Sequence, residues 1–356
     1  MKSTCFIYLL CACFVHTMHA SENLDQEKHE VKAMRCEIAN LHLAVKNNNV
    51  VMVKQLLKRP IMRDQINKVD KKGRTPIHLA SQYGYSKVLP LLLAVDNMVV
   101  DQQDANGKTS LHYAAEYGHM KAVLLLMAAG ANASMQDSHG YLPIHYAAQR
   151  DCVAIVSYLL KCMGGEVHYI PEHGGTILHY AMQPYWSCYS EGKVATYLLQ
   201  YEHIRSLLNI QNAGGCTPLH YAMWGPSLLK ILQPYSTLIN ADVSSDNGKT
   251  PLLEAICYRR YKFIKTLLKH FSVDVNKPDA DGNTPLHGIV NVLTRDDLKP
   301  DDLSKLEIIV ELLLQKKGIK VSSKNKVGKT PLALAKEAKS PNMKKIITLL
   351  RKHGAK

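Results

Sequence analysis

Short apolar runs occur in pairs along most of this chain, and a polar turn separates the two runs of each pair. Ile77 to Ala80 is followed by Val88 to Leu93, and Leu111 to Ala115 is followed by Val123 to Met127. Runs of this length and spacing indicate short amphipathic helices. One pair cannot bury its apolar face alone, so the pattern predicts an all-α array in which neighbouring pairs stack.

The first run of each pair lies inside a motif that recurs. Gly107 to His119 reads GKTSLHYAAEYGH, and Gly73 begins the similar GRTPIHLASQYGY. When the Thr or its equivalent marks each of the eight copies, the markers are positions 75, 109, 142, 176, 217, 250, 284 and 330. The steps between them are 34, 33, 34, 41, 33, 34 and 46 residues. Repetition at a nearly fixed period indicates an architectural motif and argues against a single catalytic constellation.

The residue types in the motif suit a helix N-terminus. Thr75 is expected to cap the helix, and Pro76 fits the first helical position because its missing N–H costs nothing there. His78 is expected to reach back towards the cap, and Gly84 to end the helix in the left-handed conformation. The same structural capping role is predicted for Thr109, His112, His145, His179, Thr217, His220, Thr250, Thr284, His287 and Thr330.

Several copies depart from the motif. Ser110 and Ile177 replace the proline, Leu142 replaces the threonine, and Leu253 and Ala333 replace the histidine. A copy without the capping threonine or the histidine satisfies fewer of the backbone groups that a helix start leaves free. We expect weaker helix capping in these copies and no loss of the fold.

The G-x-T-P-L-H-x-A pattern, recurring mostly at 33 or 34 residues, resembles the ankyrin-repeat family from about Cys36 to Lys356. The resemblance implies a solenoid of about nine helix-turn-helix repeats joined by β-hairpin loops. A degenerate capping repeat is expected at about 36–66, where Leu41, His42 and Ala44 remain, and the others start near 70, 104, 137, 171, 211, 245, 279 and 325. The family also implies that a protein partner binds the concave face. No G-x-S-x-G or H-E-x-x-H motif occurs, and the repeats leave no room for a separate catalytic domain, so no enzymatic activity is expected.

The N-terminal residues have the pattern of a secretory signal peptide. Lys2 supplies a positive charge, Cys5 to Val15 is an apolar run of 11 residues, and Ala20 offers a cleavage site. Residues 1–20 are therefore predicted to direct export, and residues 21–35 to form a short segment before the repeats. The alternative is a weak lipobox at Leu10 to Cys13, in which case an acylated Cys13 would make the protein a periplasmic or membrane-tethered lipoprotein.

The composition is that of an ordered protein, with 46% hydrophobic and 21% charged residues. The net charge of +14 is concentrated at the C-terminal end, where Leu312 to Lys356 contains 13 Lys or Arg and one acidic residue. This end could contact an anionic surface, or it could be a solvated cap that keeps the array soluble. Aromatic residues do not interleave with these lysines, so no nucleic acid partner is expected. The insertion before this end is acidic and contains Asp296, Asp297, Asp301 and Asp302.

Residue types that often bind metals or phosphates occur in the repeats, but their spacing argues against such sites. Histidines of successive repeats are expected to lie about 10 Å apart, too far to share one ion. The GKT at Gly107, Gly248 and Gly328 lacks the earlier glycine of a P-loop. The six cysteines beyond the signal peptide show no C-x-x-C and are expected to be buried apolar residues, although Cys152 could pair with Cys162. We therefore expect no metal and no cofactor.

Hairpin tips and late first-helix positions are the candidate binding surface that the family pattern implies. Tyr, Trp and Arg occur there, and these residue types dominate binding hot spots. The insertion QPYWSCYSEG, after Gly175, adds further aromatic side chains. The candidate partner-binding residues are Arg74, Tyr83, Lys108, Tyr117, Tyr141, Arg150, Tyr185, Trp186, Trp224 and Tyr258.

These features predict an exported, monomeric scaffold that binds a protein partner. Exported ankyrin proteins resemble the effectors that intracellular bacteria send into host cells, so a host-directed role is one interpretation. The alternative is a periplasmic or surface-tethered bacterial lipoprotein that guards or organises a partner protein. An enzyme would require a composite site on the concave face.

Overall fold

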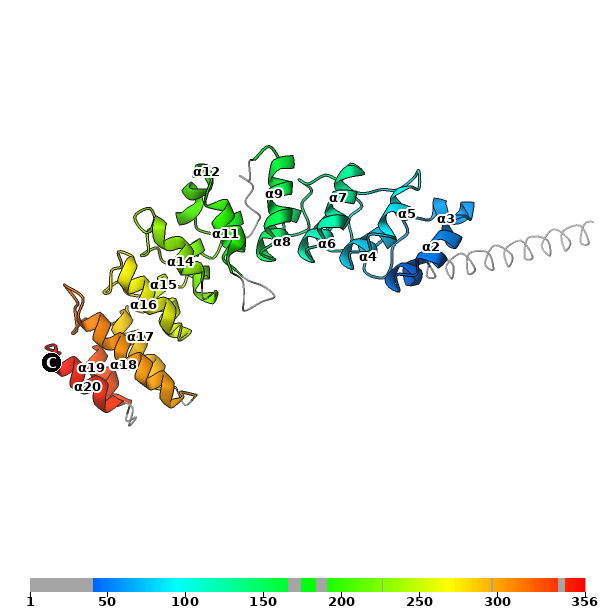
Figure 1. The fold of residues 1–356 in the computed structure, drawn as a ribbon. Coiled ribbons are helices and arrows are strands. Elements are labelled where there is room, and N and C mark those ends of the chain that lie inside the picture. The colour runs from blue at the N-terminus through cyan, green and yellow to red at the C-terminus, as the bar shows by residue number, and fades with distance from the viewer. Residues whose placement is uncertain are drawn as a thin grey trace, which may run out of the picture. The chain divides into compact units, whose positions relative to one another are not determined.

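The computed structural model describes residues 41–165, 174–183, 191–225, 227–295, 297–338 and 343–355. Within these ranges the chain is helical and contains no strand, which confirms the predicted all-α class. Contacts divide the chain into two compact units, Met1–Met135 and Gln136–Lys356, called here the N-terminal unit and the C-terminal unit (Figure 1). The predicted signal peptide, the alternative lipobox at Cys13 and residues 21–35 lie outside the described residues.

The N-terminal unit consists of stacked helix pairs. Its helices are α2 (Val50–Leu57), α3 (Pro60–Asp64), α4 (Pro76–Gln82), α5 (Leu89–Leu93), α6 (Ser110–Glu116) and α7 (Met120–Ala128), and residues 41–46 are also helical. The first helix of one repeat, α4, packs against its own second helix α5 and against α6 of the next repeat. The second helices α5 and α7 also contact each other, so first and second helices form two adjoining layers (Figure 1).

The C-terminal unit continues the same arrangement. Its first helices are α8 (Pro143–Gln149), α10 (Ile177–Ala181), α13 (Pro218–Tyr221), α15 (Pro251–Cys257), α17 (Pro285–Leu293) and α19 (Pro331–Glu337). The remaining helices are α9 (Val153–Cys162), α11 (Lys193–Leu198), α12 (Glu202–Arg205), α14 (Leu228–Leu232), α16 (Tyr261–His270), α18 (Pro300–Leu314) and α20 (Met343–Lys352), with 3-10 turns η1 (Ser206–Asn209), η2 (Ala222–Trp224) and η3 (Gln233–Tyr235). Contacts run along each layer, for example from α13 to α15 and α17, and from α14 to α16 and α18.

Each helix contributes one apolar stripe to the core between the layers. The helix α4 buries Ile77, Leu79 and Ala80, and α5 buries Leu89 and Leu92. Full burial of a Leu or Ile side chain stabilises the fold by ~1.5–3 kcal/mol relative to exposure. Helices of seven and five residues offer few such side chains, so each repeat depends on its neighbours.

Where the structure describes them, the connections between repeats are tight turns and not strand-forming hairpins. In one of them the Asp104 N–H donates to the Lys108 carbonyl (3.0 Å) and the Gly107 N–H donates to the Asp104 carbonyl (2.9 Å). The turn glycine is required for space as well as for its positive φ: a Cβ on Gly73 would lie 2.6 Å from the backbone nitrogen of Ala105 in the next turn. The predicted β-hairpin loops therefore have hairpin-type hydrogen bonds without strands in the described residues.

Two other expectations concern cysteines and membranes. Cys152 and Cys162 are both free thiols, so the pairing considered from the sequence is not present. Cys162 is exposed, and Cys152, Cys216 and Cys257 are half-buried; the expectation of buried cysteines was wrong for these four, because they lie at helix ends and turns instead of on the apolar stripes. Every helix in the described part of the chain is too short or too polar to span a bilayer.

Candidate protein-binding surfaces

The histidine of each motif is fixed by the start of its own helix. The backbone N–H of Thr75 donates to Nδ1 of His78 (3.1 Å), and the Thr75 hydroxyl lies 2.7 Å from the same nitrogen. The same contacts join Thr109 to His112, at 3.0 and 2.9 Å. They recur in the pairs Thr176–His179, Thr217–His220 and Thr284–His287, and the backbone N–H of Leu142 likewise donates to His145.

In several repeats the other ring nitrogen of the histidine joins adjacent repeats. Because Nδ1 accepts a backbone N–H, Nε2 carries the ring proton and donates it. Nε2 of His78 donates to the Lys108 carbonyl (3.0 Å), and Nε2 of His220 donates to the Lys249 carbonyl (3.2 Å). The same bond runs from His42 to Arg74, from His179 to Cys216 and from His287 to Lys329. These five histidines therefore fasten their own repeats to the next turn.

This environment favours the neutral form of the imidazoles. Burial lowers the pKa of His179 and of His220 to about 4, against an ordinary value of 6.5. Burial also lowers the pKa of His78 and of His287, while their carbonyl partners oppose the shift. A neutral imidazole with both nitrogens hydrogen-bonded within the fold is a structural group.

Repeats without the histidine use the threonine differently. The backbone N–H of Leu253 donates to the Thr250 hydroxyl (3.3 Å), and that of Ala333 donates to the Thr330 hydroxyl (3.2 Å). The hydroxyl therefore caps the helix directly where no histidine competes for it. The expected loss of capping in these repeats is offset by this ordinary N-cap.

A tyrosine that follows several of these histidines holds the inter-repeat turn, and the sequence interpretation did not identify it. The Tyr113 hydroxyl donates to Oδ2 of Asp104 (2.6 Å), and the Tyr146 hydroxyl donates to Oδ2 of Asp137 (2.6 Å). Burial and this hydrogen bond raise the pKa of Tyr113. The detectable signal is a His-Tyr dipeptide with an acidic residue nine positions before the tyrosine.

The basic residues at the turn tips are engaged within their own repeats. Arg74 forms an ion pair with Asp70 (2.8 Å) and donates to Oε1 of Gln82 (3.1 Å). Lys108 forms an ion pair with Glu116 (2.8 Å), and each of these two side chains is only 16% exposed. In both repeats the side chain at the turn tip contacts the side chain eight positions later, at the end of the first helix. Such a contact is called a clasp here. Arg74 and Lys108, predicted as partner-binding residues, therefore have intramolecular partners.

In the N-terminal unit the candidate tyrosines are exposed at the ends of the first helices. Tyr83 is 42% exposed and Tyr117 is 38% exposed, and they are the C-cap residues of α4 and α6. Gln82 links the two repeats by donating from Nε2 to the Tyr117 hydroxyl (3.2 Å). The rings of Tyr83 and Tyr85 stack at 5.4 Å. Tyr117 is thus hydrogen-bonded to the preceding repeat, and Tyr83 is stacked against Tyr85 of its own repeat.

The predicted binding residues at the start of the C-terminal unit differ from one another in exposure. Tyr141 is half-buried, and its ring contacts those of Tyr146 (5.7 Å) and Tyr180 (5.3 Å). Arg150, the C-cap residue of α8, is exposed. Tyr185 and Trp186 lie outside the described residues, so the predicted aromatic insertion stays a prediction.

A second aromatic surface lies further along the C-terminal unit. Trp224 is 40% exposed, Tyr258 is 54% exposed, and their rings are 5.1 Å apart. The guanidinium of Arg260 lies 4.3 Å from the centre of the Trp224 ring. Gly225 takes an extended conformation (φ −114°, ψ 126°) at the position where Tyr83 and Arg150 form helical C-caps in other repeats. A Cβ on Gly225 would lie 2.5 Å from the end of the Leu228 side chain, which would have to shift to accommodate it.

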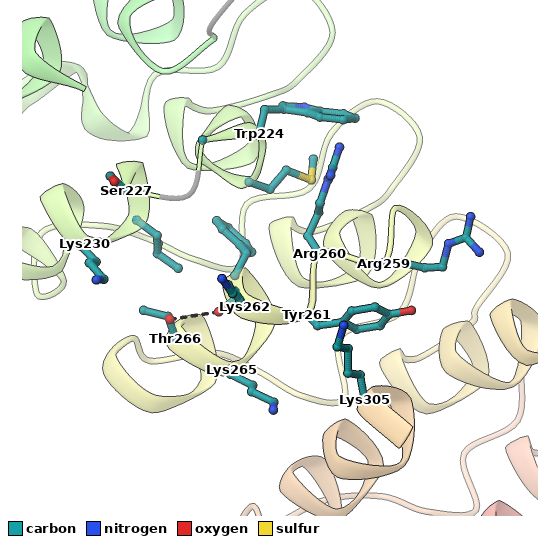
Figure 2. Close-up of a pocket in the computed structure, with 14 residues that line it drawn as sticks. Trp224, Ser227, Lys230, Arg259, Arg260, Tyr261, Lys262, Lys265, Thr266 and Lys305 are labelled. Carbon is teal, nitrogen blue, oxygen red and sulfur yellow. Dashed lines mark hydrogen bonds between the residues drawn. The ribbon is translucent and has the colours of Figure 1, made fainter. Parts of the chain in front are cut away.

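Trp224 forms one wall of a groove with a volume of about 680 Å³. The lining comes from the end of η2, from α14, from the α15–α16 turn, from α16 and from Lys305 of α18. Figure 2 shows Arg260 reaching towards the Trp224 ring and Lys305 lying beside Tyr261. None of the described residues that line the groove is acidic, and the basic ones are Lys230, Arg259, Arg260, Lys262, Lys265 and Lys305.

The acidic insertion contacts this groove. Asp297 forms an ion pair with Arg259 (2.8 Å), and Asp301 forms one with Lys305. The sequence left open whether the insertion neutralises the basic end or is a separate docking loop; these two pairs connect it to the preceding repeat and to its own helix. Within the basic end itself, Lys329 pairs with Glu337. Contact of that end with an anionic surface stays a prediction.

Comparisons with known proteins agree with this architecture. A family model described as Ankyrin repeats (3 copies) matches residues 16–101, 41–137, 91–170 and 119–185, and one described as Ankyrin repeat matches residues 247–280. The chain is 29% identical over 147 residues to nuclear factor NF-kappa-B p105 subunit from Gallus gallus, and this alignment covers 41% of the chain. It is 30% identical over 164 residues to transient receptor potential cation channel subfamily A member 1 from Homo sapiens, and this alignment covers 45% of the chain.

Each of these alignments covers 14% of the relative's own length, so the similarity concerns the repeat region. The family models together match more than half of the chain, on both sides of the division between the two units. The chain therefore belongs to the ankyrin-repeat family, whose repeats form protein-binding scaffolds and are typically non-catalytic.

Proposed function

We propose that this protein captures a protein partner through the aromatic side chains at the ends of its first helices. One observation carries the proposal: Tyr83, Tyr117, Trp224 and Tyr258 are all between 38% and 54% exposed. Large aromatic side chains left in solvent mark interaction sites, and Tyr and Trp are enriched at binding hot spots. Arg74 and Lys108 contribute less, because binding through them would require their intramolecular ion pairs to break.

Site-specific photo-crosslinking tests this proposal even while the partner is unidentified. A photoreactive phenylalanine analogue replaces Tyr117 in one variant and Leu124 in a matched control. Leu124 is 41% exposed but lies on the second helix α7. We expect a discrete adduct from candidate host lysate at position 117 and none at position 124. Equal adducts at both positions, or none at Tyr83, Tyr117, Trp224 and Tyr258, would contradict the proposal.

We further propose that the scaffold is exported through residues 1–20 and acts on a partner outside the cell that makes it. The charged start, the apolar run and Ala20 support this proposal, and the competing one is tethering through Cys13. Mass spectrometry of the mature N-terminus distinguishes them. A chain that starts at Ser21 supports free export, an acylated Cys13 supports the lipoprotein, and an intact Met1 on the cellular protein contradicts both.

A further inference from the structure

We propose that the groove beside Trp224 binds an acidic, extended segment of a partner protein, with one apolar side chain of that segment against the Trp224 ring. This inference rests on the proposed function as a protein-binding scaffold. It adds the chemistry of the ligand and a site on the second-helix layer, between α14 and α16. That site is distinct from the tyrosine surface of the N-terminal unit.

The charge of the groove is the first argument. Asp297 and Asp301 already neutralise Arg259 and Lys305 at one edge. The other lysines of the lining, Lys230, Lys262 and Lys265, form no ion pair with any residue that the structure describes. Like charges gathered without counter-charges repel one another, and an acidic ligand would relieve that repulsion.

The arrangement of these lysines favours an elongated ligand. Lys262, Lys265 and Lys269 follow one another at spacings of three and four residues on α16, so they share one face of that helix. Lys265 and Lys269 also line a smaller groove with Ile308 and Leu312 of α18. The three lysines span about 10 Å along the helix, roughly the length of three residues of extended chain. An extended acidic segment could therefore contact them in succession.

The aromatic wall provides the apolar contact. The Arg260 guanidinium covers part of the Trp224 ring at 4.3 Å, and Tyr258 lies beside it at 5.1 Å. Met223, Leu229 and Phe263 extend the apolar surface inside the groove. Such a pocket accommodates one apolar anchor within a basic rim, which is the arrangement of a protein hot spot.

A protein segment fits these features better than a lipid surface or a single-stranded nucleic acid. A lipid headgroup layer would contact the lysines but not Met223, Leu229 and Phe263, which are buried in the groove lining. Nucleic acid bases need successive open ring faces for stacking. Here Arg260 covers part of the Trp224 ring and Tyr258 is tilted by 57° against it, so the two rings do not offer parallel faces to successive bases. Ankyrin-repeat membership also indicates a protein partner.

The chain contains two tryptophans, so a Trp186→Phe background makes Trp224 the sole reporter of groove occupancy. The probe is a synthetic peptide that alternates Glu and Ala around one central Leu, and the control peptide has Gln in place of Glu. We expect the acidic peptide to change Trp224 emission saturably, and the Gln peptide to bind at least about tenfold more weakly. Equal binding of both peptides, or no response to either, overturns the proposal.

Charge variants separate a specific site from the general basicity of the chain. Lys262→Gln with Lys265→Gln should raise the Kd for the acidic peptide about fivefold or more. Lys324→Gln with Lys326→Gln removes the same charge from exposed lysines of the last inter-repeat turn and should leave that Kd unchanged. Equal weakening by the two double variants overturns the proposal. Both variants should keep the thermal unfolding midpoint of the background protein, which shows that folding is intact.

Two further probes test the competing ligands. Vesicles that contain phosphatidylserine and an oligothymidylate are titrated under the same conditions. Tighter binding of either probe than of the acidic peptide overturns the assignment to a protein segment, and weaker binding supports it. Crosslinking at Tyr117 in the N-terminal unit is measured in parallel. If that adduct persists while no peptide binds the groove, this inference fails and the proposed scaffold function stands.

Discussion

The turn after the first helix differs between the two units, although the helices on either side of it are alike. In the Thr109 repeat of the N-terminal unit, the residue ten positions after the threonine is His119, whose Nε2 lies 3.1 Å from the Gln82 carbonyl of the preceding repeat. In the Thr250 repeat of the C-terminal unit, the residue at that position is Arg260, which covers part of the Trp224 ring of the preceding repeat. At this position His119 therefore contacts the backbone of the preceding repeat, whereas Arg260 lines the groove beside Trp224.

The same comparison holds for the residue just before this position, which takes a left-handed conformation. It is Gly84 (φ 66°) and Gly118 (φ 75°) in two repeats of the N-terminal unit and Asn48 (φ 53°) in the first, whereas in the C-terminal unit Asp151 (φ 58°) and Arg259 (φ 57°) adopt it despite their longer or charged side chains. Those side chains make contacts that glycine cannot: Asp151 accepts the Val194 N–H (2.7 Å), and Arg259 pairs with Asp297. The backbone shape is therefore common to these repeats, and the side chain at this position can connect the turn to the following repeat.

The largest expected effect tests what the two units share, the buried histidines. Since the folded-state pKa of His179 and His220 is about 4 and the ordinary value is 6.5, the unfolded chain takes up protons first as the pH falls. Their contribution to stability is complete above pH 6.5 and declines between 6.5 and 4, by up to about 3 kcal/mol for each histidine. We expect urea unfolding to show this loss between about pH 7 and about pH 4.5.

Replacing one buried histidine with leucine separates its contribution to the pH dependence from those of the others. Leucine occurs naturally at this position as Leu253 in a neighbouring repeat. His220→Leu should reduce the pH-dependent loss by that histidine's share and lower stability at neutral pH, because the bond to the Lys249 carbonyl is lost. His203→Leu changes an exposed histidine and is the matched control. A full wild-type pH dependence in His220→Leu would show that the buried imidazoles do not cause the acid sensitivity.

The next prediction concerns Gly84 in the closed turn. A Cβ on Gly84 would lie 2.5 Å from the His119 ring, and its φ of 66° disfavours any side chain. Gly84→Ala should therefore lower the free energy of unfolding by about 2–3 kcal/mol, from left-handed strain together with overpacking. Gly130 also has a positive φ, but a Cβ added there would have no neighbouring atom within 4 Å. Gly130→Ala should cost about 1 kcal/mol, and equal costs at both sites would exclude the His119 contact as the cause.

The sequence was sufficient for the repeat architecture because each copy carries the same local signals. Every marker position is the N-cap of a first helix, including Leu142, which lacks a capping side chain. The surfaces were harder to predict, because they depend on pairs of residues in different repeats. Trp224 and Arg260 are 36 residues apart, and no local pattern indicates that one covers the other. Arg74 and Lys108 have the residue type of binding sites, but residues within their own repeats already pair with them.

A smaller effect is expected at the clasp of Lys108 and Glu116, which the N-terminal unit has and the Trp224 repeat lacks. The two side chains are largely buried, so a double-mutant cycle with Lys108→Gln and Glu116→Gln should give a coupling energy of about 0.5–1 kcal/mol. The Tyr117 crosslink should persist in Lys108→Gln. Loss of the crosslink in a variant that remains folded would restore Lys108 as a binding residue.

The smallest expected effect is at Arg259, where two changes oppose each other. Arg259→Gly removes the ion pair with Asp297, whose carboxylate is 61% exposed, and this should cost about 0.5 kcal/mol. It also removes left-handed backbone strain at φ 57°, which should stabilise the folded state by about 1 kcal/mol. Glycine also gives the unfolded chain more conformational freedom, and this offsets part of that gain. The free energy of unfolding should therefore change by less than about 0.5 kcal/mol, whereas Asp297→Ala alone should be slightly destabilising. A loss above about 2 kcal/mol in Arg259→Gly would mean that this side chain holds the acidic insertion in place far more strongly than an exposed ion pair can.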